Sequence, residues 1–309
     1  MNITLIGAGA MGSTIGGFLS ESGANVYFVD PFEAHVKAIN EKGLIYEVNG
    51  KVKTAKIKAY TSADQIDEKM DLIIFLVKGL FTDTAAQASV GLASDDTYIL
   101  TAQNGVGNVE ILEKYFSKDK LLQGMIEFGA KMVEPGHVSA LISPTAKVII
   151  GPVNRVINGR IKEIGEYFTK SGLNFAVHEN MDPDIWYKMT KNCSSNPICA
   201  IVKLPLGPYK DCPEGSDIEK EIISEVRAVA IEVPPDPGVA AGKKLTSDNP
   251  MYHHLPSTAQ DVKGRKKTEI DFLNGAVVKY GEKYGAATPY NSMITALVKI
   301  IEKNYDAQF

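Results

Sequence analysis

The N-terminal residues Asn2-Ile-Thr-Leu-Ile6-Gly7-Ala8-Gly9-Ala10-Met11-Gly12-Ser13 form the stretch that decides the fold. Residues 2–6 are predicted to form a short buried strand, and residues 13–22 a helix. In this context Gly7 permits a tight turn, Gly9 lets the backbone approach a pyrophosphate, and Gly12 lets the helix pack against the strand. The unpaired N–H groups at the start of such a helix attract anions. The pattern predicts a dinucleotide site, whereas the alternative is a βαβ turn without a ligand. The predicted cofactor-binding residues of the turn are Gly7, Ala8, Gly9, Ala10, Met11 and Gly12.

An acidic residue then closes the second predicted strand, residues 26–29. Asp30 stands about 20 residues after the glycines, where a carboxylate accepts hydrogen bonds from the adenine ribose and opposes a 2′-phosphate. Residues 31–35 contain no arginine that would hold such a phosphate. We therefore expect NAD(H) to be favoured over NADP(H). Lys37 and Lys78 are the two cations in this region that could still reach a 2′-phosphate.

Composition indicates a globular protein of two domains. The chain has 309 residues, a net charge of −4, 23% charged residues and 44% hydrophobic residues. Its one dense basic patch, residues 263–267, is short enough to be a solvated turn, so no nucleic-acid partner is expected. No apolar stretch approaches the ~20 residues that a membrane span requires, and the chain enters a strand at once, so neither a membrane segment nor a signal peptide is expected.

The cysteines and histidines lack the spacing of a metal site. Cys193, Cys199 and Cys212 form no CxxC pair and are expected to be free thiols in a reducing cytoplasm. The five histidines show no HExxH pattern, so no metal is expected. A catalytic role for Cys193 is the weaker alternative, because no histidine lies near it in sequence.

Strands and helices alternate through the first half of the chain and predict an α/β fold with a doubly wound sheet of the Rossmann type. An Asn49-Gly50 turn predicts a hairpin. After residue 30, strands are expected at 44–48, 52–59, 71–77, 98–102, 121–132, 138–142, 147–150 and 174–178, and helices at 33–42, 82–92 and 157–171.

The second half is expected to be entirely helical. The pattern changes near Glu179, which predicts a dinucleotide-binding domain over residues 1–179 and a substrate-binding and catalytic domain over residues 180–309. The proline-rich residues 233–238 predict a rigid break between helices. Helices are expected at 184–201, 216–231, 257–264, 268–284 and 291–304.

Two polar residues follow predicted strands at the sheet edge where α/β proteins bind ligands. Lys78 follows the strand 71–77 and is either a phosphate or carboxylate ligand or a solvated lysine. Asn104 follows the strand 98–102 and either caps a turn or binds the nicotinamide ribose or the substrate.

A second polar group lies on the first predicted helix of the second half. Lys188, Asn192 and Asn196 are spaced at i, i+4 and i+8 and therefore share one helix face. Two amides and an amine on a buried face are costly without polar partners, and a ligand would supply them. The alternative is an exposed polar stripe.

The run Ile185-Trp-Tyr-Lys188-Met-Thr-Lys-Asn192-Cys-Ser-Ser-Asn196-Pro197 resembles the substrate helix of the ketopantoate reductases (2-dehydropantoate 2-reductases). Residues 256–261, 264–265, 268–275 and 284–291 resemble later parts of that family. With the N-terminal glycines and Gln103-Asn104-Gly105, the matches extend over nearly the whole chain.

The resemblance implies a role for each matching residue. Lys188 would be the general acid, Glu269 would assist it, and the reaction would be the reduction of 2-dehydropantoate to pantoate, a step towards coenzyme A. Ser257 would bind the carboxylate of this small-molecule 2-keto acid, and Lys78 would lie near the cofactor. The implied substrate-binding residues are Asn104, Asn192, Asn196 and Ser257.

Departures from the family pattern leave the coenzyme and the keto acid open. Residues 127–130 read Glu-Phe-Gly-Ala where the family often has threonines, and Asp30-Pro31 stands where NADP-using members carry a basic residue. Some NAD-dependent D-2-hydroxyacid dehydrogenases, of the D-mandelate type, share this fold and helix motif, and they are the second alternative. A non-catalytic nucleotide sensor is the third alternative, against which the presence of both Lys188 and Glu269 argues. A homodimer is compatible with each function.

Overall fold

The computed structural model describes residues 1–230 and 246–307, and the chain forms two compact units. Unit 1 comprises Met1–Gln103 and Asn108–Met181. Unit 2 comprises Asn104–Gly107 together with the chain from Asp182 onward. The predicted break at residues 233–238 lies outside the described residues.

Unit 1 is built on an eight-stranded sheet. Neighbouring strands pair in parallel, except that β11 pairs antiparallel with β8, so β11 and β12 run opposite to the other strands. In spatial order they are β12 (Phe175–Val177), β11 (Val148–Pro152), β8 (Leu121–Ile126), β7 (Tyr98–Thr101), β6 (Leu72–Phe75), β1 (Asn2–Ile6), β2 (Asn25–Val29) and β5 (Lys58–Tyr60).

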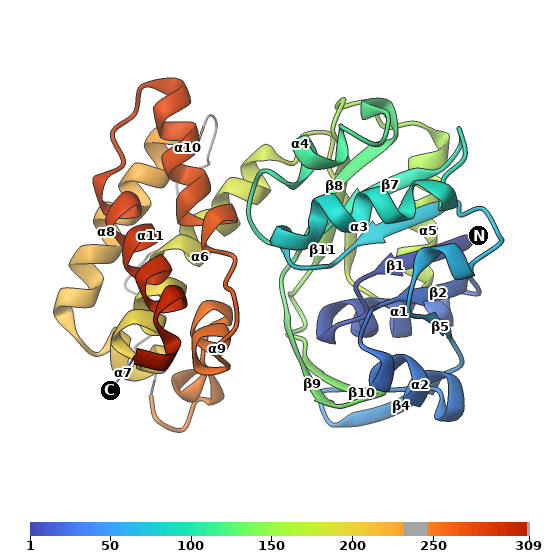
Figure 1. Ribbon diagram of the computed structural model, residues 1–309, viewed down its shortest axis with the longest axis horizontal. Coiled ribbons are helices and arrows are strands. Elements are labelled where there is room, and N and C mark those ends of the chain that lie inside the picture. Colours follow the sequence, from blue (N-terminus) through green and yellow to red (C-terminus); the bar gives the residue numbers. More distant parts are fainter. Residues whose placement is uncertain (231–245, 308–309) are drawn as a thin grey trace. The chain divides into compact units, whose positions relative to one another are not determined.

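Helices cover both faces of this sheet, as the doubly wound prediction requires (Figure 1). Alternate residues of a strand point to opposite faces. Ile3 and Leu5 of β1 therefore pack with α1 (Ala10–Glu21) and α5 (Gly159–Lys170). Ile6 packs in a separate cluster with α3 (Thr82–Ser89) and α4 (Asn108–Leu112). The remaining helix of this unit, α2, spans Glu33–Lys42.

A second, four-stranded sheet corrects two of the strand predictions. It contains β4 (Lys51–Ala55), β3 (Leu44–Val48), β10 (His137–Leu141) and β9 (Gly129–Glu134), in that order. The segments 52–59 and 121–132, each predicted as one strand, are each divided between the two sheets. The physical reason is visible in burial, because β8 is almost entirely buried whereas β9 is largely exposed. The predicted Asn49-Gly50 turn joins β3 to β4, with positive φ at both residues.

Unit 2 is helical and is organised around the 21-residue helix α6 (Asp182–Val202). Helix α6 packs against α8, α9 and α11, and their buried apolar side chains form one core. The predicted helix 268–284 is instead a 3-10 turn, η6 (Ile270–Phe272), followed by α10. Within the described residues, the other helices of this unit are α7 (Leu206–Lys210), α8 (Pro213–Val229), α9 (Ser257–Lys263), α10 (Asn274–Tyr284) and α11 (Pro289–Lys303).

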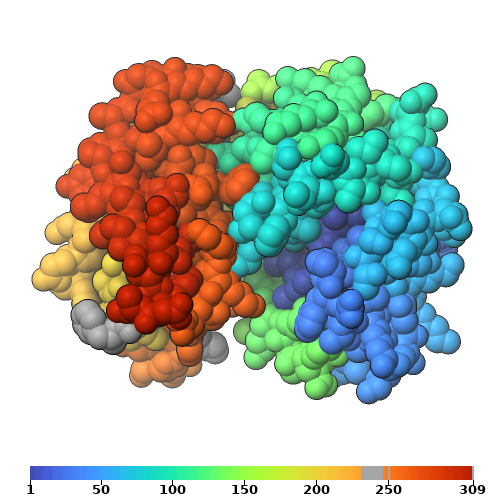
Figure 2. Space-filling view, in the orientation of Figure 1, coloured from blue at the N-terminus to red at the C-terminus, as the bar shows by residue number. Residues whose placement is uncertain are grey.

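Helix α11, which is drawn in dark red in Figure 2, carries an exposed apolar stripe. Its members Tyr290, Met293, Leu297 and Ile300 recur at helical spacing and are 36–58% exposed. Among the described helices, none is both long and apolar enough to cross a membrane.

Candidate active site

The glycine-rich turn of unit 1 leaves space where a pyrophosphate would bind. Gly7 has φ +96°, and a Cβ on it would lie 2.6 Å from the backbone nitrogen of Val77. A Cβ on Gly12 would lie 2.0 Å from the carbonyl oxygen of Gly7. By contrast, nothing lies within 4 Å of a Cβ built on Gly9. Helix α1 begins at the next residue and has no acidic residue in its first turn. The turn therefore fits a bound dinucleotide phosphate.

A buried chain of hydrogen bonds supports this turn. The N–H of Gly136 donates to Nδ1 of His35 at 2.9 Å, so the imidazole carries its proton on Nε2. That nitrogen lies 3.0 Å from Oγ of Ser13, and the Ser13 hydroxyl donates to the carbonyl oxygen of Ala8 at 2.7 Å. Ala8, Ser13 and His35 are all fully buried. The sequence pattern did not identify Ser13 or His35, because a lone histidine on a helix has no motif.

Asp30 and Lys78 lie at the carboxyl edge of the main sheet. Asp30 directly follows β2, is half-buried, and accepts a hydrogen bond from the N–H of Phe32 at 2.9 Å through Oδ1. Lys78 is half-buried and precedes the 3-10 turn η2 (Gly79–Phe81) after β6. Both residues therefore belong to the sheet edge at which α/β proteins bind ligands.

In unit 2 the structure brings together three of the predicted substrate residues. Nδ2 of Asn196 lies 3.5 Å from Oδ1 of Asn192 and 3.5 Å from Oγ of Ser257. Ser257 begins helix α9, which packs against α6. Lys188 is half-buried one turn before Asn192 on the same helix. An ammonium, two amides and a hydroxyl are thus provided by two adjacent helices.

Asn104 belongs to unit 2, although the sequence placed it in the dinucleotide-binding domain at the end of a strand. The N–H of Val106 donates to the carbonyl oxygen of Phe272 at 2.9 Å. Gly105 has φ +84°, and a Cβ on it would lie 2.2 Å from the same oxygen. Asn104 therefore lies in the segment that packs on η6, which Glu269 immediately precedes. Glu269 is half-buried.

The two buried cysteines are poorly suited to act as nucleophiles. Cys193 is fully buried, and burial raises the pKa of its thiol far above the usual range. Burial also raises the pKa of Cys199 to about 11. Within residues 1–230 and 246–307, no group of three His, Cys, Asp or Glu side chains could hold a metal ion.

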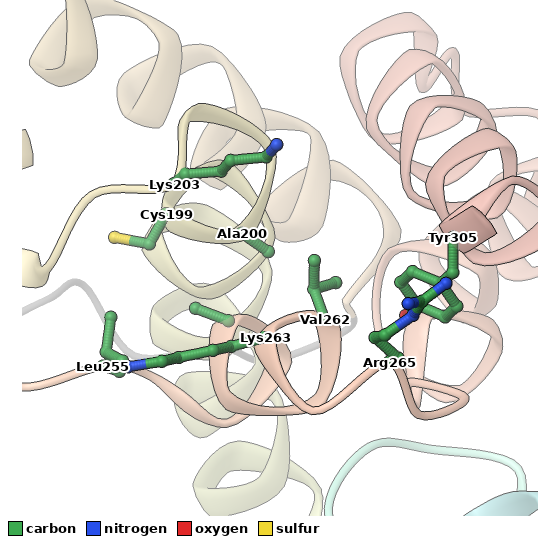
Figure 3. Close-up of a pocket in the computed structure, with 9 residues that line it drawn as sticks. Cys199, Ala200, Lys203, Leu255, Val262, Lys263, Arg265 and Tyr305 are labelled. Carbon is green, nitrogen blue, oxygen red and sulfur yellow. The ribbon is translucent and has the colours of Figure 1, made fainter. Parts of the chain in front are cut away.

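Unit 2 also has a cavity of about 300 Å³ at the C-terminal end of α6 (Figure 3). Cys199 and Ala200 of α6, together with Lys203 just after it, line the cavity from one side. Val262 and Lys263 of α9 line it from the other. None of the predicted site residues lines this cavity, so it is separate from the Asn192–Asn196–Ser257 group.

Two family models match the chain, one in each half. The model described as ketopantoate reductase PanE/ApbA matches residues 3–155. The model of the C-terminal part of the same family matches residues 180–302. Together they include every predicted site residue.

Relatives and solved structures match over almost the full chain. A 2-dehydropantoate 2-reductase of Lactococcus lactis is 32% identical over 307 residues, which are 96% of this chain and 97% of the relative. A crystal structure of a ketopantoate reductase from Ralstonia eutropha has a TM-score of 0.88 at 28% identity, covering 99% of this chain and 100% of that chain. A ternary structure of D-mandelate dehydrogenase with NADH and anilino(oxo)acetate has a TM-score of 0.86 at 29% identity, with the same two coverages.

Proposed function

This chain belongs to the ketopantoate reductase family, a family of oxidoreductases, and on that premise we propose that it reduces the ketone of 2-dehydropantoate to give pantoate. The observation that carries the proposal is the convergence of Asn192, Asn196 and Ser257 beside the helix face that holds Lys188. This set can bind a small polar acid and supply a proton to it. We further propose unit 1 as the coenzyme-binding domain and unit 2 as the catalytic one.

Lys188 is the proposed general acid. A nicotinamide coenzyme, when bound, supplies the hydride for the ketone carbon. Negative charge then develops on the ketone oxygen, where the ammonium of Lys188 stabilises it and donates the proton. Glu269 favours the charged form of Lys188 if it lies close to it in the complex, because an opposite charge raises the pKa of an amine.

The remaining side chains hold the substrate. The hydroxyl of Ser257 donates to the substrate carboxylate. The amides of Asn192 and Asn196, together with Glu269, bind the terminal hydroxyl of the keto acid. Asn104 binds the nicotinamide ribose or the substrate. The 3.5 Å spacings around Asn196 support this assignment, since a ligand could replace these long contacts with shorter hydrogen bonds.

NADH is the proposed coenzyme rather than NADPH. The turn of Gly7, Ala8, Gly9, Ala10, Met11 and Gly12 binds the pyrophosphate. Asp30 binds the adenine ribose through its carboxylate, whose charge opposes a 2′-phosphate. Lys78 would contact the coenzyme from the neighbouring strand end.

A D-2-hydroxyacid dehydrogenase is the second candidate. Two observations favour it: the similarity to the D-mandelate dehydrogenase solved with NADH, and the acidic residue Asp30 at the end of β2. Its substrates would be branched or aromatic 2-keto acids that lack the terminal hydroxyl of 2-dehydropantoate. A site whose amides and carboxylate bind that hydroxyl should reject such acids, because its polar groups would be left unpaired.

An initial-rate panel tests the substrate. The keto acids are 2-dehydropantoate, 2-oxoisovalerate and phenylglyoxylate, each with NADH. We expect the highest kcat/KM for 2-dehydropantoate, and we expect Glu269→Ala to shrink its advantage over 2-oxoisovalerate. A higher kcat/KM for either of the other two acids would replace the first candidate by the second. No turnover of any 2-keto acid would refute both.

The same assay with NADPH tests the coenzyme. We expect a higher kcat/KM with NADH, and we expect Asp30→Ala to narrow the difference because it removes the carboxylate that opposes the 2′-phosphate. A matched control is Glu33→Ala, which removes an exposed carboxylate three residues further on. A wild-type preference for NADPH would contradict the assignment of Asp30.

The proposal includes a cytoplasmic location and a homodimer. Cys193, Cys199 and Cys212 are all free thiols, as a reducing compartment favours. The apolar stripe on α11 offers a surface for a second copy.

A further inference from the structure

Helix α6 contains a proline in its interior, within the stretch that carries the proposed site. Pro197 directly follows Asn196, and the helix continues through it to Val202. Proline has no backbone N–H, so the carbonyl oxygen four residues earlier, that of Cys193, loses its helical partner. Cys193 directly follows Asn192 and is fully buried, so water does not replace the missing donor.

A side chain from another helix supplies that donor. Nδ2 of Asn274, at the start of α10, donates to the carbonyl oxygen of Cys193 at 3.0 Å. The same Nδ2 donates to Oδ1 of Asn291 at 2.9 Å. Asn274 is fully buried, and its Oδ1 has no hydrogen-bond partner within the described chain. The two donated bonds are therefore what this amide contributes.

Asn291 in turn is fixed by a buried carboxylate. Its Nδ2 donates to Oε2 of Glu225 at 2.7 Å, and its backbone N–H donates to the same oxygen at 2.9 Å. Glu225 lies on α8 and is 8% exposed. A continuous chain of hydrogen bonds thus runs from α8 through α11 and α10 to the backbone of α6.

We infer that Asn274 is a positioning residue, which holds the proline-interrupted turn of α6 in place and so sets the geometry of Asn192 and Asn196. The inference rests on the proposed function for its effect on catalysis. The interrupted turn spans Cys193 to Pro197, so Asn196 lies within it and Asn192 directly precedes it. Movement of this turn would change the position of the two amides relative to Ser257. Asn274 does not itself need to touch the substrate.

A double-mutant cycle with Pro197 tests the inference. Asn274→Leu keeps the approximate shape of the side chain but removes the donor. We expect it to lower Tm by about 5 °C or more, because two buried carbonyl oxygens, that of Cys193 and Oδ1 of Asn291, lose this donor. Pro197→Ala restores an N–H that can bond to the Cys193 carbonyl. In the Pro197→Ala background, Asn274→Leu should therefore lower Tm by half as much or less.

Activity is measured on the same four proteins. We expect Asn274→Leu to lower kcat about tenfold through misplacement of the site, with the Kd for NADH unchanged because the glycine turn lies in unit 1. In the Pro197→Ala background the fall in kcat should be smaller. Asn274→Ser, which is too short to reach Cys193, gives the same comparison if Asn274→Leu does not fold.

A control variant shows whether Pro197→Ala restores the bond to the Cys193 carbonyl or simply stabilises the whole protein. Val277→Ala, on the same helix and fully buried, removes packing without touching the Cys193 carbonyl. Pro197→Ala should leave the Tm loss of Val277→Ala unchanged. Equal Tm losses for Asn274→Leu in both backgrounds would overturn the inference. If Asn274→Leu loses less Tm in the Pro197→Ala background, as expected, but leaves kcat unchanged, the catalytic part of the inference would be overturned.

The Tm arm also distinguishes this inference from the proposed function. A protein that shows the Tm coupling but reduces no 2-keto acid would refute the proposed function and leave the bond between Asn274 and the Cys193 carbonyl supported. A protein that reduces 2-dehydropantoate but shows no Tm coupling would support the proposed function and refute the inference about Asn274.

Discussion

At the scale of single residues, His35 connects the coenzyme turn to a distant part of unit 1. It accepts from Gly136 in the turn between β9 and β10 and contacts Ser13, which bonds to Ala8. The bond from Gly136 requires the neutral imidazole, because a protonated ring cannot accept the Gly136 N–H, whereas the Nε2–H group can donate to Ser13 in either form. Burial lowers the pKa of His35 below 6.5 and outweighs the opposing influence of the Asp30 charge. The neutral form that the network requires is thus the form that burial favours.

This network predicts a loss of stability as the solution becomes acidic. Above pH 6.5 His35 is neutral in both the folded and the unfolded state, so its contribution is fully present. As the pH falls below 6.5, the unfolded chain binds a proton that the folded chain does not, and stability decreases. The slope from one such group is at most about 1.4 kcal/mol per pH unit.

Urea unfolding between pH 5 and 8 measures this effect. His35→Gln should be less stable than the wild type at pH 8 and should show a weaker dependence on pH below 6.5. His253→Gln, which changes an exposed histidine, is the control and should retain the wild-type dependence. An identical pH dependence for wild type and His35→Gln would show that His35 is not the titrating group.

The residues that sequence could identify are those with a motif or a spacing. Gly7, Gly9 and Gly12 were identifiable because each has a separate steric role in the turn. The Asn192–Asn196 contact followed from helical spacing. His35 and Asn274 could not be identified in this way, because their partners lie 17 to 101 residues away in the chain. A proline at position 197 of a helix leaves the carbonyl oxygen of Cys193 without its helical donor, but the sequence does not indicate which residue donates instead.

At the scale of elements, the geometry of the turn between β1 and α1 predicts how a substitution at Gly9 affects stability and NADH binding. A methyl group at Gly9 would meet no protein atom within 4 Å, so Gly9→Ala should fold with a Tm close to that of the wild type. The same methyl group would occupy the space proposed for the pyrophosphate, so the Kd for NADH should rise by about tenfold or more.

Gly91→Ala is the matched control for this variant, since its Cβ also has no neighbour within 4 Å and the residue lies outside the turn. It should leave both Tm and the NADH Kd unchanged. Calorimetry and a fluorescence titration with NADH measure the two quantities. An unchanged NADH Kd in Gly9→Ala would mean that the coenzyme binds elsewhere.

The order of elements was predictable, but the assignment of strands to sheets was not. The central strands β6 and β7 have nearly continuous apolar runs because both of their faces are covered. The segment 121–132 has the same appearance over its first half only, and the chain changes sheet at residues 127–128. Such a change depends on pairing between β9 and β10 and between β10 and β3, which local pattern does not encode.

At the scale of the whole molecule, the chain divides its proposed tasks between two units. The glycine turn, Asp30 and Lys78 belong to unit 1, whereas Lys188, Asn192, Asn196, Ser257 and Glu269 belong to unit 2. The helical second half was predictable from its periodicity. The placement of Asn104 in unit 2 was not, because it depends on the contact of Gly105 and Val106 with Phe272, more than 160 residues later in the chain.

This division predicts that chemistry and coenzyme binding can be separated by mutation. Lys188→Ala should leave the Kd for NADH nearly unchanged, because the residue lies in unit 2. Loss of a general acid should lower kcat by ~10²-fold or more. Lys191→Ala is the control, since Lys191 is an exposed lysine on the same helix that contacts the ring of Tyr187. It should retain near wild-type kcat.

The rate of NADH oxidation with 2-dehydropantoate, measured for the wild type, Lys188→Ala and Lys191→Ala at saturating coenzyme, tests the central claim most directly. The account predicts turnover by the wild type and Lys191→Ala, and a fall of ~10²-fold or more in Lys188→Ala with NADH still bound. A folded Lys188→Ala protein that reduces 2-dehydropantoate at the wild-type rate would contradict it.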